Sequence, residues 1–231
     1  MQSLLTKYGV LKGLTFTEKY DDGSLKECIL SEPVEISTAY GVFVPQYEND
    51  GARRKYTKSI SFYKSRNLKS IALQEQTSVR TPVGIFPAEL ITFYESGSIK
   101  RLFPLNGKIS GFWTEENEYE LAQEFEFNLE FTSFKKKIIA IHFYECGSIK
   151  GLTFWPGENV LVPTSSGDIS VRIGITLYPA GSLESIEPAT PTSVKTPIGN
   201  IMAYNPNPIG VHSDNNSLKF FQDGTIKSLL S

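Results

Sequence analysis

The sequence predicts an all-β fold, in which repeated β-hairpins form an antiparallel meander that is elongated or curled, like a β-solenoid. Three observations predict it. Alanine, the best helix former, is scarce, whereas the 231 residues include 15 Phe, 11 Tyr, 18 Gly and 13 Pro. A motif that runs from an aromatic residue to a turn glycine recurs along the chain. A second turn motif recurs between its copies, so each repeat reverses direction at least twice.

Composition limits the class of protein. Hydrophobic residues make up 40% of the chain and charged residues 21%, as in a folded globular protein. The formal charge of −2 lacks the basic excess of a nucleic-acid binder. No apolar run is long enough to span a bilayer, and Lys7 and Lys12 interrupt any signal-peptide core at the N-terminus. We therefore expect a cytoplasmic protein that folds as a single domain over residues 1–231.

Six segments share the first motif. FYESGSIKRL (93–102) and FYECGSIKGL (143–152) are nearly identical, and KYDDGSLKEC, FYKSRNLKSI, LYPAGSLESI and FFQDGTIKSL have the same form. Three positions before the turn stands an aromatic residue: Tyr20, Tyr63, Tyr94, Tyr144, Tyr178 and Phe221. Two positions after the turn stands Leu or Ile, and five positions after it an apolar residue or cysteine. Between these two lies a lysine column, which Glu184 interrupts: Lys26, Lys69, Lys100, Lys150 and Lys227.

Each copy predicts one β-hairpin, because β-forming residues flank a small polar turn whose Gly or Asn tolerates a positive φ. Two registers are open at this point. A two-residue loop would place Tyr94 opposite Ile99, and a three-residue loop would place Phe93 opposite Ile99. One residue of slip exchanges the two faces of the sheet, so the pattern leaves open which face is buried.

The second motif lies between these hairpins. SVRTPVG (78–84) and SVKTPIG (193–199) are almost the same string, and EISTAYG (35–41), KISG (108–111) and VPTSSG (162–167) are weaker versions. In Thr-Pro-x-Gly, proline fixes φ near about −65° and glycine suits the exit of a tight turn. Each of these segments predicts a second chain reversal.

The pattern aromatic-x-x-Gly-Ser-Ile/Leu-Lys resembles the variant MORN repeat (membrane occupation and recognition nexus), and the matching positions run from Tyr20 to Lys227. The resemblance implies short hairpins laid side by side, a binding or scaffolding role, and tyrosines and glycines that are structural, not catalytic. The chain departs from that family in its turn-to-turn spacings of 43, 31, 50, 34 and 43 residues, which are longer and less regular than the family unit. The second glycine-rich half of that unit is also missing.

The spacing of 50 residues marks an insertion at about residues 112–140. Thr114 followed by acidic residues predicts a short helix to about residue 123. Alternating apolar residues in EFEFNLEF (124–131) predict a half-buried strand. Another long stretch, residues 42–58, reads as an extra hairpin.

Few residues could carry catalysis. Cys28 and Cys146 stand in different repeats and different columns, so we expect two thiols and neither a disulfide framework nor a zinc site. His142 falls in a polar column and is expected to face solvent or the sheet rim. His212-Ser213-Asp214 contains the residue types of a catalytic triad, but the residues of a triad come from distant parts of a sequence, so we do not expect one here.

Carboxylates are the remaining chemical candidates. Seven Glu between Glu115 and Glu130 could supply paired carboxylates for glycoside hydrolysis, but a solvated face beside Lys135–Lys137 is the simpler interpretation. Asp214, Asn215 and Asn216 could bind a cation, although one formal charge makes a poor calcium site. We expect no catalytic residues, no cofactor and no metal.

The two columns of the first motif are the candidate binding surfaces. The aromatic column could be a core stripe or an exposed platform for a sugar or peptide. The lysine column could meet an acidic partner, or could be a solvated face that blocks edge pairing. The candidate site residues are Tyr20, Tyr63, Tyr94, Tyr144, Tyr178, Lys26, Lys69, Lys100, Lys150 and Lys227.

The expected function is that of a non-catalytic β-repeat protein that binds another macromolecule through its sheet surface. The expected partner is a protein, with an anionic membrane surface ranked below it and nucleic acid excluded. The alternative is small-molecule or carbohydrate binding through the aromatic column, and a carboxylate-based hydrolase ranks third.

Overall fold

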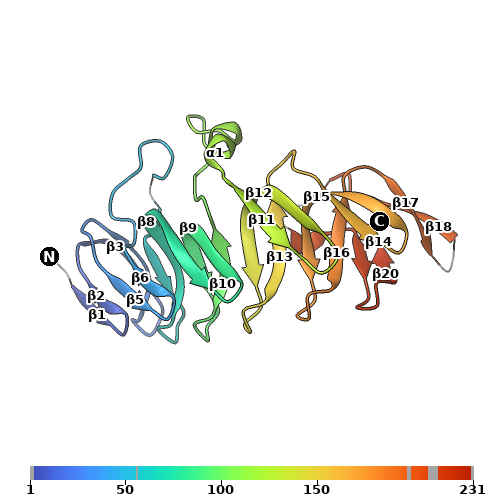
Figure 1. Ribbon diagram of the computed structural model, residues 1–231. Coiled ribbons are helices and arrows are strands. Elements are labelled where there is room, and N and C mark those ends of the chain that lie inside the picture. Colours follow the sequence, from blue (N-terminus) through green and yellow to red (C-terminus); the bar gives the residue numbers. More distant parts are fainter. Residues whose placement is uncertain (1–2, 56, 197–198, 208–212, 230–231) are drawn as a thin grey trace. The chain divides into compact units, whose positions relative to one another are not determined.

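The computed structural model describes residues 3–55, 57–196, 199–207 and 213–229, and it confirms the all-β antiparallel prediction (Figure 1). Strands dominate these ranges, with one α-helix, α1 (Glu115–Leu121), and one 3-10 turn, η1 (Ser213–Asn215). The chain divides into two compact units, the first of residues 1–121 with 145–147, and the second of the remaining residues. That the whole chain acts as a single domain stays a prediction.

Unit 1 contains a meander in which the order of strands in the sheet is β3-β4-β7-β8-β9-β10, each antiparallel to the next. Their bounds are β3 Leu14–Lys19, β4 Leu25–Leu30, β7 Ile60–Phe62, β8 Leu68–Thr81, β9 Gly84–Phe93 and β10 Ile99–Phe103. Two separate hairpins lie beside this sheet and beside each other (Figure 1). They are formed by β1 (Leu4–Thr6) with β2 (Gly9–Leu11), and by β5 (Ile36–Thr38) with β6 (Gly41–Phe43).

Unit 2 repeats this plan with the strand order β12-β13-β15-β16-β19-β20. These strands are β12 Ser133–Phe143, β13 Ile149–Phe154, β15 Gly167–Leu177, β16 Leu183–Pro188, β19 Leu218–Phe220 and β20 Ile226–Leu229. Two further strands pair at the side, β11 (Glu124–Asn128) with β12 and β14 (Val160–Thr164) with β15. A separate hairpin of β17 (Thr192–Thr196) and β18 (Gly199–Ala203) projects from the rest of the unit (Figure 1).

The six aromatic-to-glycine segments each form a hairpin, and we call them the turn hairpins. The structure settles their register in favour of the longer loop, because Phe93 pairs with Ile99 and the Tyr94 amide donates to the Ser98 carbonyl. Phe93 and Ile99 are both buried, 2% and 3% exposed. The residue before the aromatic residue is buried in five copies, at Phe62, Phe93, Phe143, Leu177 and Phe220, whereas Lys19 in the first copy is exposed, and the aromatic residue itself falls on the turn.

The two apolar columns of the turn hairpins are buried to different degrees. The position five after the turn is buried in each copy whose side chain is described: Cys28, Ile71, Leu102, Leu152 and Ile186. The position two after the turn is buried at Leu68, Ile99 and Leu183 but half-buried at Leu25, Ile149 and Ile226. Burial of this column is therefore not uniform along the chain.

The second motif forms tight hairpins with two residues at the tip, which we call the Thr-Gly hairpins. Thr81 pairs with Gly84, and the Thr81 hydroxyl donates to the Gly84 carbonyl at 2.8 Å while accepting the Val83 amide at 3.3 Å. The same hydroxyl-to-carbonyl bond closes four other hairpins, those of Thr6–Gly9, Thr38–Gly41, Thr164–Gly167 and Thr196–Gly199. The glycine has a positive φ in each of the five, which explains why this residue type recurs there.

Tips of the Thr-Gly hairpins rest on turn hairpins further along the chain. The amide of Leu68 donates to the Tyr8 hydroxyl at 3.0 Å, and the amide of Ile99 donates to the Tyr40 hydroxyl at 3.2 Å. Pro82 lies against Gly147 so closely that a Cβ on the glycine would be 2.6 Å from the proline Cγ. All three contacts lie within unit 1. Each of them joins a Thr-Gly hairpin to the second turn hairpin that comes after it in the sequence.

Unit 2 shows the same relation. The Ser165 hydroxyl donates to the Gly224 carbonyl at 2.9 Å, so the hairpin of β14 and β15 rests on the turn between β19 and β20. In the hairpin of β11 and β12, the loop residue Glu130 lies beside Gly181, where an added Cβ would be 3.4 Å from the carboxylate. Each repeat thus covers the turn of a later one.

The insertion matches its prediction in part. Helix α1 begins after Thr114, whose hydroxyl accepts the Asn117 amide at 3.2 Å as an N-cap. Strand β11 is shorter than expected, and Phe127 is its buried residue. The extra hairpin expected over residues 42–58 is reduced to an isolated bridge between Asp50 and Arg54.

The hairpin expected at KISG (108–111) is absent, and no described strand covers these residues. The reason is that the backbone before them binds buried carboxylates. The amides of Asn106 and Gly107 donate to Glu89 and Glu118, both at 2.7 Å, and the Ser110 amide donates to the Trp113 carbonyl at 2.8 Å, so the chain turns here without forming a pair of strands.

Candidate functional site

The predicted tyrosine column occupies the turns, and its hydroxyls are used by the fold. Tyr20 donates to the Phe62 carbonyl at 2.9 Å, and Tyr63 donates to the Phe93 carbonyl at 2.8 Å. In unit 2, Tyr144 donates to the Leu177 carbonyl and Tyr178 to the Phe220 carbonyl, at 2.9 and 2.7 Å. Each bond runs from one turn hairpin to the next along the chain. The tyrosines therefore tie neighbouring repeats together while their rings stay half-buried.

Tyr63 shows the electrostatic effect of this position. Burial raises the pKa of its phenol, and the negative charge of Glu95 and the neighbouring Tyr20 act in the same direction. The Tyr63 hydroxyl is thus held protonated and available as a donor to the Phe93 carbonyl.

The predicted lysine column lies directly over the aromatic column. The ammonium groups of Lys69 and Lys100 sit 5.7 and 5.5 Å from the ring centroids of Tyr63 and Tyr94. In unit 2, the corresponding distances are 5.6 Å for Lys150 over Tyr144 and 5.8 Å for Lys227 over Phe221. These are cation–π contacts, which keep the lysine stem on the ring and its charge at the surface. Each unit carries two of these pairs, and we call the two pairs of a unit its lysine–aromatic face.

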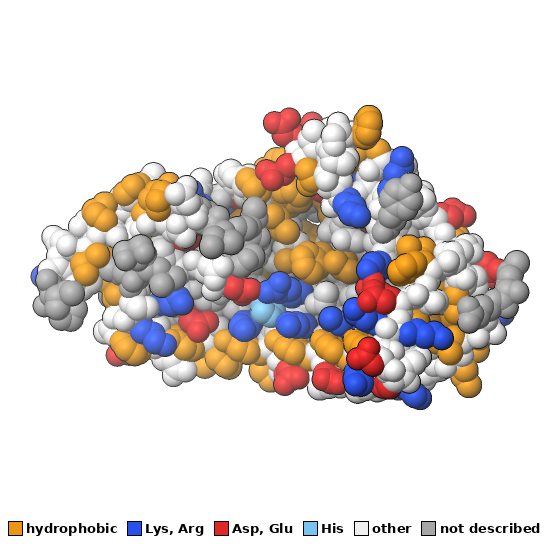
Figure 2. Space-filling model, turned by 180° about the vertical axis from the view of Figure 1, so that it is seen from behind, with side chains coloured by type: hydrophobic (Ala, Val, Ile, Leu, Met, Phe, Trp, Pro, Cys, Tyr) orange, Lys and Arg blue, Asp and Glu red, His pale blue; other side chains and the backbone are white. Residues whose placement is uncertain are grey.

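The first and fifth copies depart from this pattern. Lys26 binds Glu18 at 2.5 Å, and this hydrogen bond raises the pKa of the lysine. In the fifth copy Glu184 stands where the other copies have lysine. On the side shown in Figure 2, Lys and Arg side chains lie close to hydrophobic ones.

A buried ionic cluster lies in unit 1, and no motif in the sequence predicts it. The Arg53 guanidinium donates to Glu118 from Nε and Nη2 at 2.8 and 2.7 Å, and to Glu89 from Nη1 and Nη2 at 3.0 and 2.7 Å. All three side chains are at most 8% exposed. Burial opposes the charge of Arg53, but the bonds to Glu118 and Glu89 outweigh it and raise the arginine pKa.

This cluster anchors the insertion and does not form a reactive carboxylate pair. The Trp113 indole also donates to Glu118, at 2.6 Å, so each carboxylate is saturated by donors. Glu118 is the one buried member of the acidic run, and the other described glutamates from Glu115 to Glu130 are exposed. This acidic segment is therefore a solvated face in which only Glu118 is buried, where it holds the insertion to the rest of unit 1.

The remaining chemical candidates are scattered. Of the two placements expected for His142, solvent or the sheet rim, the first is wrong, because the side chain is only 8% exposed. Its Nδ1 lies 3.7 Å from Asp214 Oδ1. His212 lies outside the described residues. Neither cysteine forms a disulfide; Cys28 is buried and Cys146 exposed. Within the described ranges, no cluster of three His, Cys, Asp or Glu side chains could hold a metal ion.

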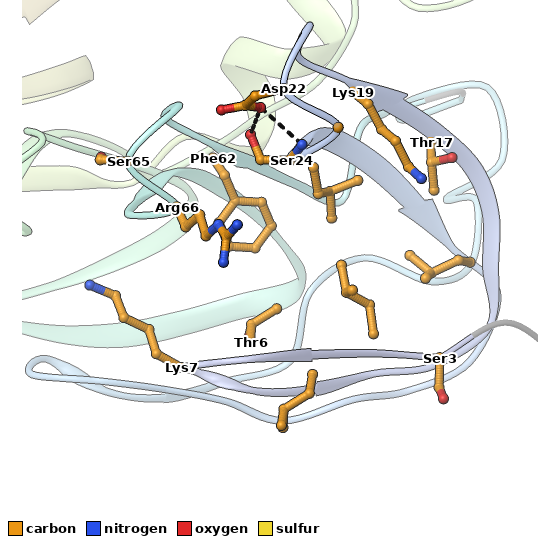
Figure 3. Close-up of a pocket in the computed structure, with 15 residues that line it drawn as sticks. Ser3, Thr6, Lys7, Thr17, Lys19, Asp22, Ser24, Phe62, Ser65 and Arg66 are labelled. Atoms are coloured by element: carbon orange, nitrogen blue, oxygen red, sulfur yellow. Dashed lines mark hydrogen bonds between the residues drawn. The ribbon is translucent and has the colours of Figure 1, made fainter.

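An open groove lies beside the first turn hairpin in unit 1 (Figure 3). Its volume is about 760 Å³, and four segments line it: β1 with the residues next to it, β3, the turn at Asp22–Leu25, and the following turn hairpin at Phe62, Ser65 and Arg66. Asp22 points away from the cavity to bind the amide and hydroxyl of Ser24, at 3.0 and 2.5 Å. Leucines and Phe62 supply an apolar floor.

No family model, curated protein or solved structure matches this chain. Among the helices described, none is long and apolar enough to cross a membrane.

Proposed function

We propose that this chain is a non-catalytic repeat protein that binds another macromolecule, a protein with an acidic surface, through the lysine–aromatic face. The observation that supports it is the placement of Lys69, Lys100, Lys150 and Lys227 over aromatic rings. An ammonium held on a ring loses less conformational freedom when a carboxylate binds it than one on a free stem does. The partly exposed ring supplies apolar contact beside the charge.

The same geometry favours a protein partner over a carbohydrate. A sugar platform needs open ring faces, and here ammonium groups lie over them. The resemblance to variant MORN repeats implies a binding or scaffolding role as well. We also propose that the protein resides in the cytoplasm.

The test is a pair of double variants in unit 1. Lys69→Ala with Lys100→Ala removes two charges of the face, and Lys12→Ala with Lys55→Ala removes two exposed charges elsewhere. Polyglutamate serves as the acidic probe, followed by fluorescence anisotropy. We expect the first variant to bind about three- to tenfold more weakly, because each exposed ion pair contributes up to about 1 kcal/mol.

The controls decide between sources of anionic charge. Equal losses in both double variants would show non-specific attraction and would contradict the proposal. Binding to phosphatidylserine vesicles in preference to polyglutamate would assign the face to a membrane surface instead. Binding to the probe should also weaken as salt is raised, since exposed charges are screened.

A further inference from the structure

The second and third turn hairpins each bind a tyrosine ring from an earlier Thr-Gly hairpin. At the second, the ring of Tyr8 packs on Phe62 with centroids 6.4 Å apart, and its hydroxyl accepts the Leu68 amide at 3.0 Å. At the third, the ring of Tyr40 packs on a phenylalanine at the same centroid distance of 6.4 Å, and its hydroxyl accepts the Ile99 amide at 3.2 Å. Each of these turn hairpins thus holds one phenol between an aromatic side chain and a backbone amide.

The first turn hairpin has the same register, but the open groove lies at the corresponding place. Lys19 pairs with Leu25 in this hairpin, and both residues line the groove. Phe62 and Leu68 form the corresponding pair in the second turn hairpin. Among the residues that the structure describes, no tyrosine hydroxyl accepts the Leu25 amide. A guest molecule in the groove can therefore bind the amide that a tyrosine binds at the later turns.

Charge distinguishes the groove from the two places that tyrosines fill. Lys19 stands where the second turn hairpin has Phe62, so a guest ring meets an ammonium group there instead of a phenyl ring. Figure 3 shows the Lys19 side chain directed into the cavity. Of the described lining residues, Lys7, Lys19 and Arg66 are cationic and Asp22 is anionic, which leaves an excess of two positive charges. This balance favours a dianionic ligand.

The apolar side chains of the groove favour a ring over a bare ion. Leu4, Leu5 and Leu14 line the groove together with Phe62, and Leu5 is 80% exposed. A small inorganic anion would leave these side chains in contact with water, whereas an aromatic ring would cover them. The cavity volume of about 760 Å³ lies in the range of small-molecule sites.

We propose that the groove binds an aryl phosphate, with its ring on the leucines and its phosphate at the Leu25 amide, beside Lys19 and Arg66. An aryl phosphate carries about −1.5 to −2 charges at neutral pH and has three acceptor oxygens, which match the cationic excess and the amide. The group can belong to a small molecule or to a phosphotyrosyl side chain of another protein. The groove is separate from the lysine–aromatic face of unit 1, so the inference goes beyond the proposed function and does not depend on it.

Calorimetric titration of the full chain tests the two halves of the ligand separately. Phenyl phosphate is compared with inorganic phosphate, which has the charge alone, and with phenol, which has the ring alone. We expect phenyl phosphate to bind at least about tenfold more tightly than either, because only phenyl phosphate meets both the apolar side chains and the cations. Equal affinities for phenyl phosphate and inorganic phosphate would overturn the proposal.

Substitutions of Lys19 test whether this residue selects the charged ligand. Lys19→Ala should weaken the binding of phenyl phosphate about fivefold, since it removes one exposed ion pair. Lys19→Phe gives the first turn hairpin the residue type of the second. It should therefore bind phenol more tightly than the natural chain does, and phenyl phosphate more weakly.

Lys12→Ala is the matched control, because Lys12 is an exposed lysine of unit 1 outside the lining of the groove. Lys12 and Lys19 are both exposed, so each variant should fold, which circular dichroism checks. We expect Lys12→Ala to bind phenyl phosphate as the natural chain does. Equal losses in the Lys12→Ala and Lys19→Ala variants would contradict the proposal.

NMR spectroscopy of the backbone amides tests the position of the phosphate. Phenyl phosphate should shift the Leu25 amide signal and leave the signal of the Ile99 amide, which Tyr40 binds, unchanged. A Leu25 signal that does not move at saturation would overturn the proposal. A parallel titration with N-acetyl phosphotyrosine amide separates the two sources of the group. Tighter binding than phenyl phosphate assigns the groove to a phosphotyrosyl side chain, and weaker binding assigns it to a small molecule.

Discussion

Arg66 occupies a turn position that glycine holds in the other five turn hairpins. Its φ is +66°, in the left-handed region, whereas the glycines at this position have φ between +79° and +98°. A side chain with a Cβ is strained in this region by about 1–2 kcal/mol. The hairpin forms nevertheless, because its strands and the Tyr63 and Tyr8 bonds hold the turn.

We therefore expect Arg66→Gly to stabilise the protein. The relief of strain exceeds the added flexibility of the unfolded chain, which leaves a gain of about 0.5–1 kcal/mol. The converse change, Gly97→Ala, should destabilise by about 1 kcal/mol through its backbone alone, since its Cβ would meet open space. Urea denaturation measures both, and a loss of stability in Arg66→Gly would refute the strain argument.

Cys28 makes stability depend on alkaline pH. Burial raises the pKa of its thiol from 9.0 to about 12, despite a hydrogen bond with Ile60 that acts the other way. Between these two values the unfolded chain releases a proton that the folded chain keeps. The stabilisation is therefore fully present below pH 9.0 and is lost as pH rises toward 12.

The measurement compares the natural chain with Cys28→Ala over this pH range. Relative to that variant, the natural chain should lose about 1.4 kcal/mol of unfolding free energy per pH unit above the unfolded pKa. Because both chains share every other titrating group, the difference isolates the thiol. Parallel pH profiles would show that the Cys28 thiol ionises as easily in the folded state as in the unfolded one.

At the scale of the element, the turn hairpin separates a buried face from a wet one. Ile99 is 3% exposed, whereas the next residue, Lys100, lies over the Tyr94 ring at the surface. We expect Ile99→Ala to cost about 2–5 kcal/mol, the range for a buried isoleucine. Lys100→Ala should cost no more than about 1 kcal/mol, the value of an exposed cation–π contact.

Denaturant melts of these two variants test whether the lysine–aromatic face is an open surface. Near-equal losses would mean that Lys100 is as tightly packed as Ile99. The face would then have no room for a partner.

The hairpins were predictable because the chemistry of a turn is local. The six aromatic-to-glycine segments and the Thr-Pro-x-Gly segments each contain the residues that close their own loops. The first Thr-Gly hairpin, Thr6–Gly9, was not singled out, although the spacing Thr-x-x-Gly alone would have found it. That spacing also excludes KISG, which lacks the threonine whose hydroxyl closes the loop.

The buried cluster was not predictable, because its partners are distant in sequence. Arg53 meets Glu89 and Glu118 across 36 and 65 residues, and the run Arg53-Arg54-Lys55 has the composition of a solvated loop. The constant spacing between the lysine and tyrosine columns could be read from the sequence. Their contact could not be predicted, because it depends on the register of the turn hairpin, and the sequence was compatible with two registers.

At the scale of the molecule, each repeat contacts its near neighbours in sequence. In proteins of this kind, stability is approximately a sum over repeats and their interfaces. A defect in one unit should therefore loosen that unit first. Within each unit the tyrosine bonds supply part of the interfaces, since they join consecutive turn hairpins.

Ile186→Ala tests this in unit 2, where Ile186 is fully buried in β16. We expect faster amide hydrogen exchange in β15, β16 and β19, the strand and its two partners, with β3 and β4 unchanged. A uniform rise over the whole chain would show that the protein opens as a single cooperative block.

The bond that closes each Thr-Gly hairpin has a consequence for folding, because a chain of similar repeats must pack each hairpin on the correct neighbour. Threonine and glycine close the loop together with the backbone amide of the second tip residue, so the side chains of the two tip residues have no part in closure. Those tips differ: Lys7-Tyr8, Ala39-Tyr40, Pro82-Val83 and Ser165-Ser166. Near-identical repeats are prone to misassembly, because each could settle on the wrong neighbour. If the side chains at a tip fit one turn hairpin better than the others, each Thr-Gly hairpin packs on the correct turn. We therefore expect the two variable tip residues to set the order in which the repeats pack.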